Sequence, residues 1–184
     1  RQIFMVFAAF MMVELYGFQL HHIAGLMLAN HISTMIVSPI VGRMITNWGE
    51  RLTLQIEYVG LFLVFVAYAG LYWFEWPWEV AAALYIIDHI LFAAAFAQKT
   101  YFQKIADPED QAPTAAVAFT INHIAAVFLP AALGYLWLVS PDGVYSLAAA
   151  MALVSLMLSF MVPRHPAKGH ETTFRPRLTA TPAE

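Results

Sequence analysis

The sequence contains no cysteine, which excludes disulfide bonds, thiolate metal sites and cysteine nucleophiles. Charged residues are also scarce, at 11% of the chain against about 25% in a typical soluble domain. No G-x-S-x-G nucleophile elbow is present, so we expect no enzyme activity. The net charge of −3 says little, because the distribution of charge matters more than its sum. We expect no nucleic-acid partner, no cofactor and no metal.

Apolar residues dominate what is present. They make up 61% of the 184 residues, and the mean hydropathy is +0.66. A water-soluble fold of this size cannot bury so much apolar surface, because its own surface still has to be covered. We therefore predict an all-α polytopic membrane protein whose main partner is the lipid bilayer.

Polar turns divide the apolar sequence into six predicted membrane-spanning helices. They cover residues 1–16, 19–45, 52–73, 80–105, 112–138 and 144–162. The first is shorter than the roughly 20 residues that a span needs, so we expect its first turns to be missing. Residues 163–184 are polar and proline-rich, and we predict a disordered cytoplasmic tail there.

The basic residues gather at one end of these predicted spans. They are Arg43, Arg51, Lys99, Lys104, Arg164, Lys168, Arg175 and Arg177. The opposite loops contain no Lys or Arg, and one of them is an aromatic belt at residues 73–78. The positive-inside rule then predicts that the basic end and the tail are cytoplasmic, in a bacterial inner membrane.

Three spans carry a polar pair near mid-depth. The pairs are Asn30-His31, Asp88-His89 and Asn122-His123. Polar groups in the membrane need partners or water, so we expect the three pairs to converge on one cavity, while the third and sixth spans face lipid. An acid and an imidazole at that depth favour a substrate or proton-coupling site.

Simpler interpretations of these residues remain open. A lone histidine in the membrane can bond to a hydroxyl or carbonyl of a neighbouring helix, a contact of about 0.6–2 kcal/mol. Asp88 can be protonated, or it can pair with His89, His31 or His123. Such a pairing would make the site responsive to protons.

The segment 39–51, between the second and third predicted spans, resembles the loop motif of the major facilitator superfamily. The matching residues are Gly42, Gly49 and Arg51. Three positions depart from the family pattern: Thr46, where the family has an acid, and Asn47 and Glu50, where it has basic residues. Residues 99–107 and 120–126 are similar to stretches in a bacterial subgroup of transporters of that superfamily.

The resemblance implies that the chain is the carboxyl-terminal half of a twelve-helix transporter. It would comprise helices seven to twelve, with seven truncated, as a six-helix bundle of two inverted three-helix repeats. Its partner would be the missing amino-terminal half. The loop motif and nearby charges would form a cytoplasmic gate of Gly42, Arg43, Gly49, Arg51, Glu57, Lys99 and Lys104.

The leading functional prediction is secondary active transport of a small solute by alternating access, coupled to protons. Its substrate and proton-coupling residues would be Asp88, His89, His31, Asn30, Asn122 and His123. One alternative is a haem-binding electron-transfer subunit that uses histidines on facing helices. Another is a structural membrane subunit whose polar groups only hold helices together.

Overall fold

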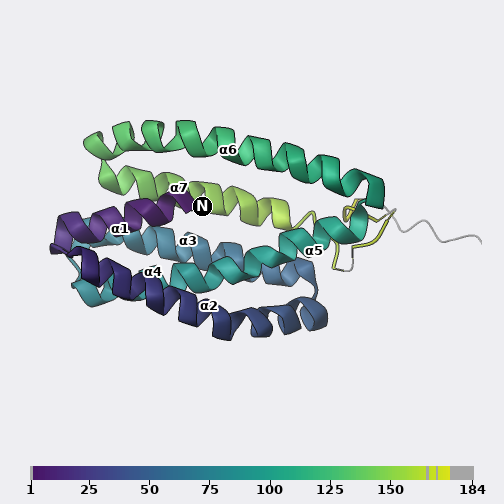
Figure 1. The fold of residues 1–184 in the computed structure, drawn as a ribbon, viewed down its shortest axis with the longest axis horizontal. Coiled ribbons are helices and arrows are strands. Elements are labelled where there is room, and N and C mark those ends of the chain that lie inside the picture. The colour runs from purple at the N-terminus through teal and green to yellow at the C-terminus, as the bar shows by residue number, and fades with distance from the viewer. Residues whose placement is uncertain (1, 165, 169, 175–184) are drawn as a thin grey trace, which may run out of the picture.

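The computed structural model describes residues 2–164, 166–168 and 170–174, and over these residues the chain is helical, without strands (Figure 1). The elements in chain order are α1 (Gln2–Tyr16), α2 (Leu20–Trp48), α3 (Glu50–Phe74), α4 (Trp78–Phe92), the 3-10 helix η1 (Ala93–Ala95), α5 (Phe96–Ile105), α6 (Pro108–Val139) and α7 (Pro141–Ser159). The prediction of an all-α fold is confirmed.

Five helical stretches of the described chain are long and apolar enough to cross a membrane. They are Leu20–Trp48, Glu50–Phe74, Trp78–Ile105, Pro108–Val139 and Pro141–Ser159. The third stretch joins α4, η1 and α5 into one span. Helix α1 is apolar but has only 15 residues. By length and composition the chain is therefore a membrane-spanning helical protein.

Helices α3 and α4 begin two residues earlier than predicted, and α6 and α7 begin four and three residues earlier. For α6 and α7 a proline explains the difference. Helix α6 begins at Pro108 instead of near residue 112, so that Pro113 lies inside the helix. Helix α7 begins at Pro141 instead of residue 144. Proline suits the first turn of a helix because the N–H it lacks would have no intrahelical partner there. The Ser140 hydroxyl caps α7 by accepting the Gly143 N–H at 3.1 Å.

Helices α3 and α7 form the most extensive helix pair of the bundle, and the core around this pair also includes residues of α1, α4 and α6. Tyr68 and Tyr145 are fully buried in this core, and their rings stack with centroids 5.1 Å apart. The opposite side of α3 presents an exposed apolar stripe at helical spacing: Leu52, Ile56, Val59, Leu63 and Val66. The third span thus has one face in the core and one face suited to lipid.

Helices α2 and α6 lie at opposite edges of the bundle in Figure 1 and are its most exposed long helices. Only Leu133 and Trp137 are buried among the 32 residues of α6. The buried residues of α2 are Ile23, Asn30, Val41 and Ile45. Both helices therefore present long apolar faces that the described chain does not cover.

The two ends of the bundle differ in composition. At the aromatic end, the Tyr16 hydroxyl donates to the Trp76 carbonyl at 2.7 Å, and Trp73 Nε1 donates to the Asp142 carboxylate at 3.0 Å. At the basic end, Lys104 pairs with Glu50. Basic and aromatic groups thus collect at opposite ends, as expected of a membrane protein with two distinct interfaces.

Residues after α7 turn back onto the basic end of the bundle. Lys168 pairs with Asp107, and the Tyr101 hydroxyl donates to the Glu171 carbonyl at 2.6 Å. Disorder of residues 163–184 stays a prediction, but Lys168 and Glu171 of that segment have partners on α5 and just before α6. Residues 165, 169 and 175–184 lie outside the described residues.

Candidate functional site

A pocket of about 270 Å³ lies between α1, α2 and α4, and we call it the polar pocket. Its lining residues are Met5, Val6, Ala9, Met27, Asn30, His31, Tyr85 and His89. Tyr85 and His89 are four residues apart, and so are Met27 and His31, which places each pair on one face of its helix. The wall from α1 is apolar, whereas α2 and α4 supply the hydrogen-bonding groups.

Asn30 is the most enclosed polar side chain of this pocket, with only 1% of its surface exposed. Neither its amide nitrogen nor its amide oxygen has a hydrogen-bond partner among the described residues. Buried amides in proteins are nearly always paired, with protein or with another molecule. Asn30 is therefore well suited to hold a polar solute or water that enters the pocket.

His31 and His89 face each other across the polar pocket, edge to face, with ring centroids 6.0 Å apart. Asp88 precedes His89 on α4 and is fully buried, although it does not itself line the pocket. The sequence placed the Asn30-His31 and Asp88-His89 pairs at similar depth, and the structure brings these two pairs together. An acid and two imidazoles in one small region can hold and pass protons.

The third predicted pair lies elsewhere. Asn122 and His123 are exposed on α6, and His123 Nδ1 lies 2.9 Å from the Phe119 carbonyl of its own helix. Helix α6 contacts α7 and α1, whereas the polar pocket is built from α1, α2 and α4. Within the described chain, Asn122 and His123 therefore do not join the other two pairs.

The span that carries Asp88 and His89 is irregular close to them. Its α-helical winding changes to the 3-10 helix η1 at Ala93–Ala95 and returns to α-helix at Phe96. A 3-10 turn within a longer helix is a common mark of a functional hinge. The polar pocket thus lies about one turn from a point where its span can bend.

The predicted gate residues lie at the basic end. Glu50 is fully buried and pairs with Lys104, whose side chain is half exposed. Glu57 is buried two turns further along the same face of α3, and Lys99 lies over the Phe96 ring at 5.5 Å. Burying an unpaired carboxylate would cost free energy, and the Lys104 ammonium group offsets part of that cost for Glu50.

The loop between α2 and α3 is tight and depends on glycine. Gly49 has φ +85°, and a Cβ there would lie 2.4 Å from the Arg164 carbonyl oxygen. Arg51 extends over the Phe160 ring at 5.7 Å, while Gly42 and Arg43 are exposed on α2. The loop therefore contacts both the end of α7 and the segment that follows it.

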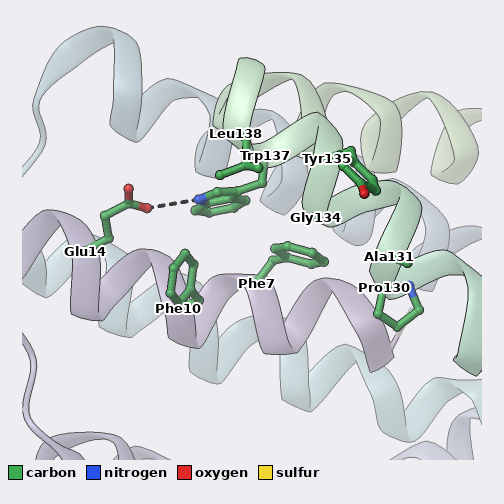
Figure 2. Close-up of a pocket in the computed structure, with 9 residues that line it drawn as sticks. All are labelled: Phe7, Phe10, Glu14, Pro130, Ala131, Gly134, Tyr135, Trp137 and Leu138. Carbon is green, nitrogen blue, oxygen red and sulfur yellow. Dashed lines mark hydrogen bonds between the residues drawn. The ribbon is translucent and has the colours of Figure 1, made fainter.

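A second pocket, of about 430 Å³, lies between α1 and α6 and was not foreseen from the sequence (Figure 2). We call it the aromatic pocket. Its lining residues are Phe7, Phe10, Glu14, Pro130, Ala131, Gly134, Tyr135, Trp137 and Leu138. The spacing of Phe7, Phe10 and Glu14 marks one face of α1, but nothing in the sequence pairs that face with Trp137.

Helix α1 separates the two pockets. Phe4, Ala8 and Met11 point into the core, Met5 and Ala9 line the polar pocket, and the Phe7 face lines the aromatic pocket. At 3.6 residues per turn these three faces are about a third of a turn apart. Helix α1 thus contributes residues to the core and to the walls of both pockets.

Comparison with known protein families, curated proteins and solved structures finds no match to this chain. The site is therefore interpreted from its own chemistry. In the described part of the chain, no group of three or more His, Asp and Glu is placed to hold a metal ion. What the polar pocket offers is hydrogen bonding from an amide, a phenol and imidazoles beside a buried acid.

Proposed function

We propose that the chain is the carboxyl-terminal half of a secondary transporter of the major facilitator superfamily, which moves a small solute by alternating access with proton coupling. The helices would form two inverted three-helix repeats, one from α1, α2 and α3 and the other from the α4–α5 span, α6 and α7. The basic end would be cytoplasmic, in a bacterial inner membrane.

The observation that carries this proposal is the polar pocket. Its amide and imidazole groups lie roughly 17 Å along α2 and α4 from the aromatic end, near the middle of a bilayer. Substrate and coupling-ion sites of secondary transporters lie at that depth, often beside an irregular helix. Proton uptake at Asp88, His89 or His31 would bias the bundle between its two orientations.

The exposure of α2 and α6 supports a missing amino-terminal half as partner. In a twelve-helix transporter both helices would face the central cavity, and there Asn122 and His123 could reach the substrate from α6. The described chain covers only one side of each helix. The half alone would thus leave part of its substrate path open.

The proposal is tested with the full-length protein in proteoliposomes, by recording currents and uptake for a panel of small solutes. An inward proton gradient should drive accumulation of at least one solute. The Asp88→Asn variant should lose that accumulation while still exchanging the solute across the membrane without a gradient. Asp110→Asn, an exposed acid at the start of α6, is the matched control and should transport normally.

Two results would contradict the proposal. One is proton-driven accumulation that survives in Asp88→Asn, which would remove Asp88 from the coupling step. The other is the absence of any solute-dependent current or uptake in protein that is folded and correctly inserted. In that case the buried polar groups would serve helix packing alone.

A further inference from the structure

The aromatic pocket has the composition of a site for an organic cation. Phe7 and Phe10 of α1 and Trp137 of α6 form its aromatic wall, and Glu14 lies at one end of it (Figure 2). Among the described lining residues Glu14 is the only charged side chain, and no Lys, Arg or His lies among them. The pocket therefore presents one acidic side chain and an aromatic wall in which Phe10 is exposed, Phe7 is half-buried and Trp137 is buried behind them.

The ring geometry is held in place by neighbours. Phe7 stacks on Trp137 with centroids 5.2 Å apart, and Phe10 meets the same indole edge-on at 5.5 Å. Trp137 is buried on its far side against Tyr72 and Tyr145. A rigid aromatic wall retains its electrostatic preference for a cation without being ordered first.

Glu14 is positioned by the same indole. Trp137 Nε1 donates to Glu14 Oε2 at 3.0 Å, as Figure 2 shows. A carboxylate has about four acceptor positions, so one N–H leaves it able to attract a further positive group. Glu14 and the ring faces thus attract the same kind of ligand.

The remaining wall leaves room for that ligand. Gly134 lies on the pocket wall, and a Cβ added there would meet nothing within 4 Å. The volume of about 430 Å³ lies within the range of small-molecule sites. A hydrated metal ion gains no favourable contact from apolar walls. An alkylated ammonium group can interact with both the aromatic rings and the carboxylate.

We infer that the aromatic pocket binds a quaternary or alkylated ammonium group, with Glu14 as the counter-charge and the rings of Phe7 and Phe10 beside it, held in place by Trp137. The group belongs either to a free solute or to a lipid headgroup. The aromatic pocket has no lining residue in common with the polar pocket, and binding to it is measured without transport.

The test is equilibrium binding of radiolabelled phenyltrimethylammonium to the full-length protein in phosphatidylglycerol nanodiscs. Glu14→Gln, which keeps an acceptor for Trp137, should weaken binding about tenfold or more. Gly134→Leu should abolish binding by filling the pocket. Glu79→Gln, an exposed acid near the aromatic end of α4, should bind as the unmodified protein does.

Phosphatidylcholine nanodiscs separate the two sources of the ammonium group. Weaker probe binding there assigns the site to a lipid headgroup, and equal binding assigns it to a free solute; either supports the site. The inference is overturned if Glu14→Gln and Gly134→Leu both bind like the unmodified protein. It is also overturned if the neutral isostere tert-butylbenzene displaces the probe as well as the unlabelled cation does.

Discussion

The polar pocket and the aromatic pocket share α1 as a wall but take their other residues from different helices. The polar pocket uses α2 and α4 and encloses Asn30, whose amide has no partner in the described chain. The aromatic pocket uses α6, and its one acid, Glu14, is exposed and already accepts a hydrogen bond from Trp137.

This difference has opposite consequences for stability. An unsatisfied buried amide costs free energy in the folded state, and such groups persist where function requires them. A stacked aromatic cluster stabilises the folded state and here connects α6 to α1. The polar pocket therefore lowers the free energy of unfolding, and the aromatic pocket raises it.

Among the variants that test this difference in stability, Trp137→Ala should have the largest effect on the free energy of unfolding. Trp137 is one of two buried residues of α6, so its loss should lower the free energy of unfolding by about 3–5 kcal/mol. Equilibrium unfolding in mixed micelles measures this change. Trp48→Ala, at the exposed end of α2, is the control. A loss below about 1 kcal/mol for Trp137→Ala would mean that the rings do not hold α6 in place.

Asn30→Leu is expected to stabilise the protein, in contrast to Trp137→Ala. Removing an unpaired buried amide should raise the free energy of unfolding by about 1–3 kcal/mol. The same change should abolish proton-driven solute accumulation, because the pocket loses its buried amide. Asn122→Leu, at an exposed position of α6, serves as the stability control. A destabilised Asn30→Leu protein would show instead that Asn30 is paired in the membrane and contributes to packing.

The smallest effect is expected from His123→Ala. His123 is exposed, and its Nδ1 lies within hydrogen-bonding distance of the Phe119 carbonyl of its own helix, so the free energy of unfolding should change by less than about 0.5 kcal/mol. Binding of phenyltrimethylammonium should not change either. Unfolding and binding assays on one preparation check both points, and a large change in either would link His123 to one of the pockets.

The sequence predicted much of the fold because hydrophobic run length and turn composition are local properties. The all-α class and the separation of the aromatic end from the basic end both depend on such patterns. The sequence did not predict the contacts made by residues after α7. The polar, proline-rich composition of that segment favours disorder, and it carries no information on which groups elsewhere in the fold lie close to it. Tyr101, for example, receives its partner from Glu171, which is 70 residues away.

The predicted depth of a polar residue along its span did not by itself predict which residues meet in one site. Counting residues along a helix gives the depth of a side chain but not the direction in which it points. Asn30 and His31 come together with His89, whereas Asn122 at a similar depth is exposed on a helix at the far edge. The aromatic pocket was missed for a related reason, since Glu14 and Trp137 are separated by 123 residues.

Because α1 is a wall of both pockets, occupancy of one is thermodynamically linked to occupancy of the other whenever a ligand shifts or stiffens that helix. If an ammonium group beside Glu14 changes the affinity of the polar pocket for its solute by some factor, the solute must change the affinity for the ammonium group by the same factor. If both pockets bind ligands as proposed, the 15-residue helix α1 would couple the two binding equilibria.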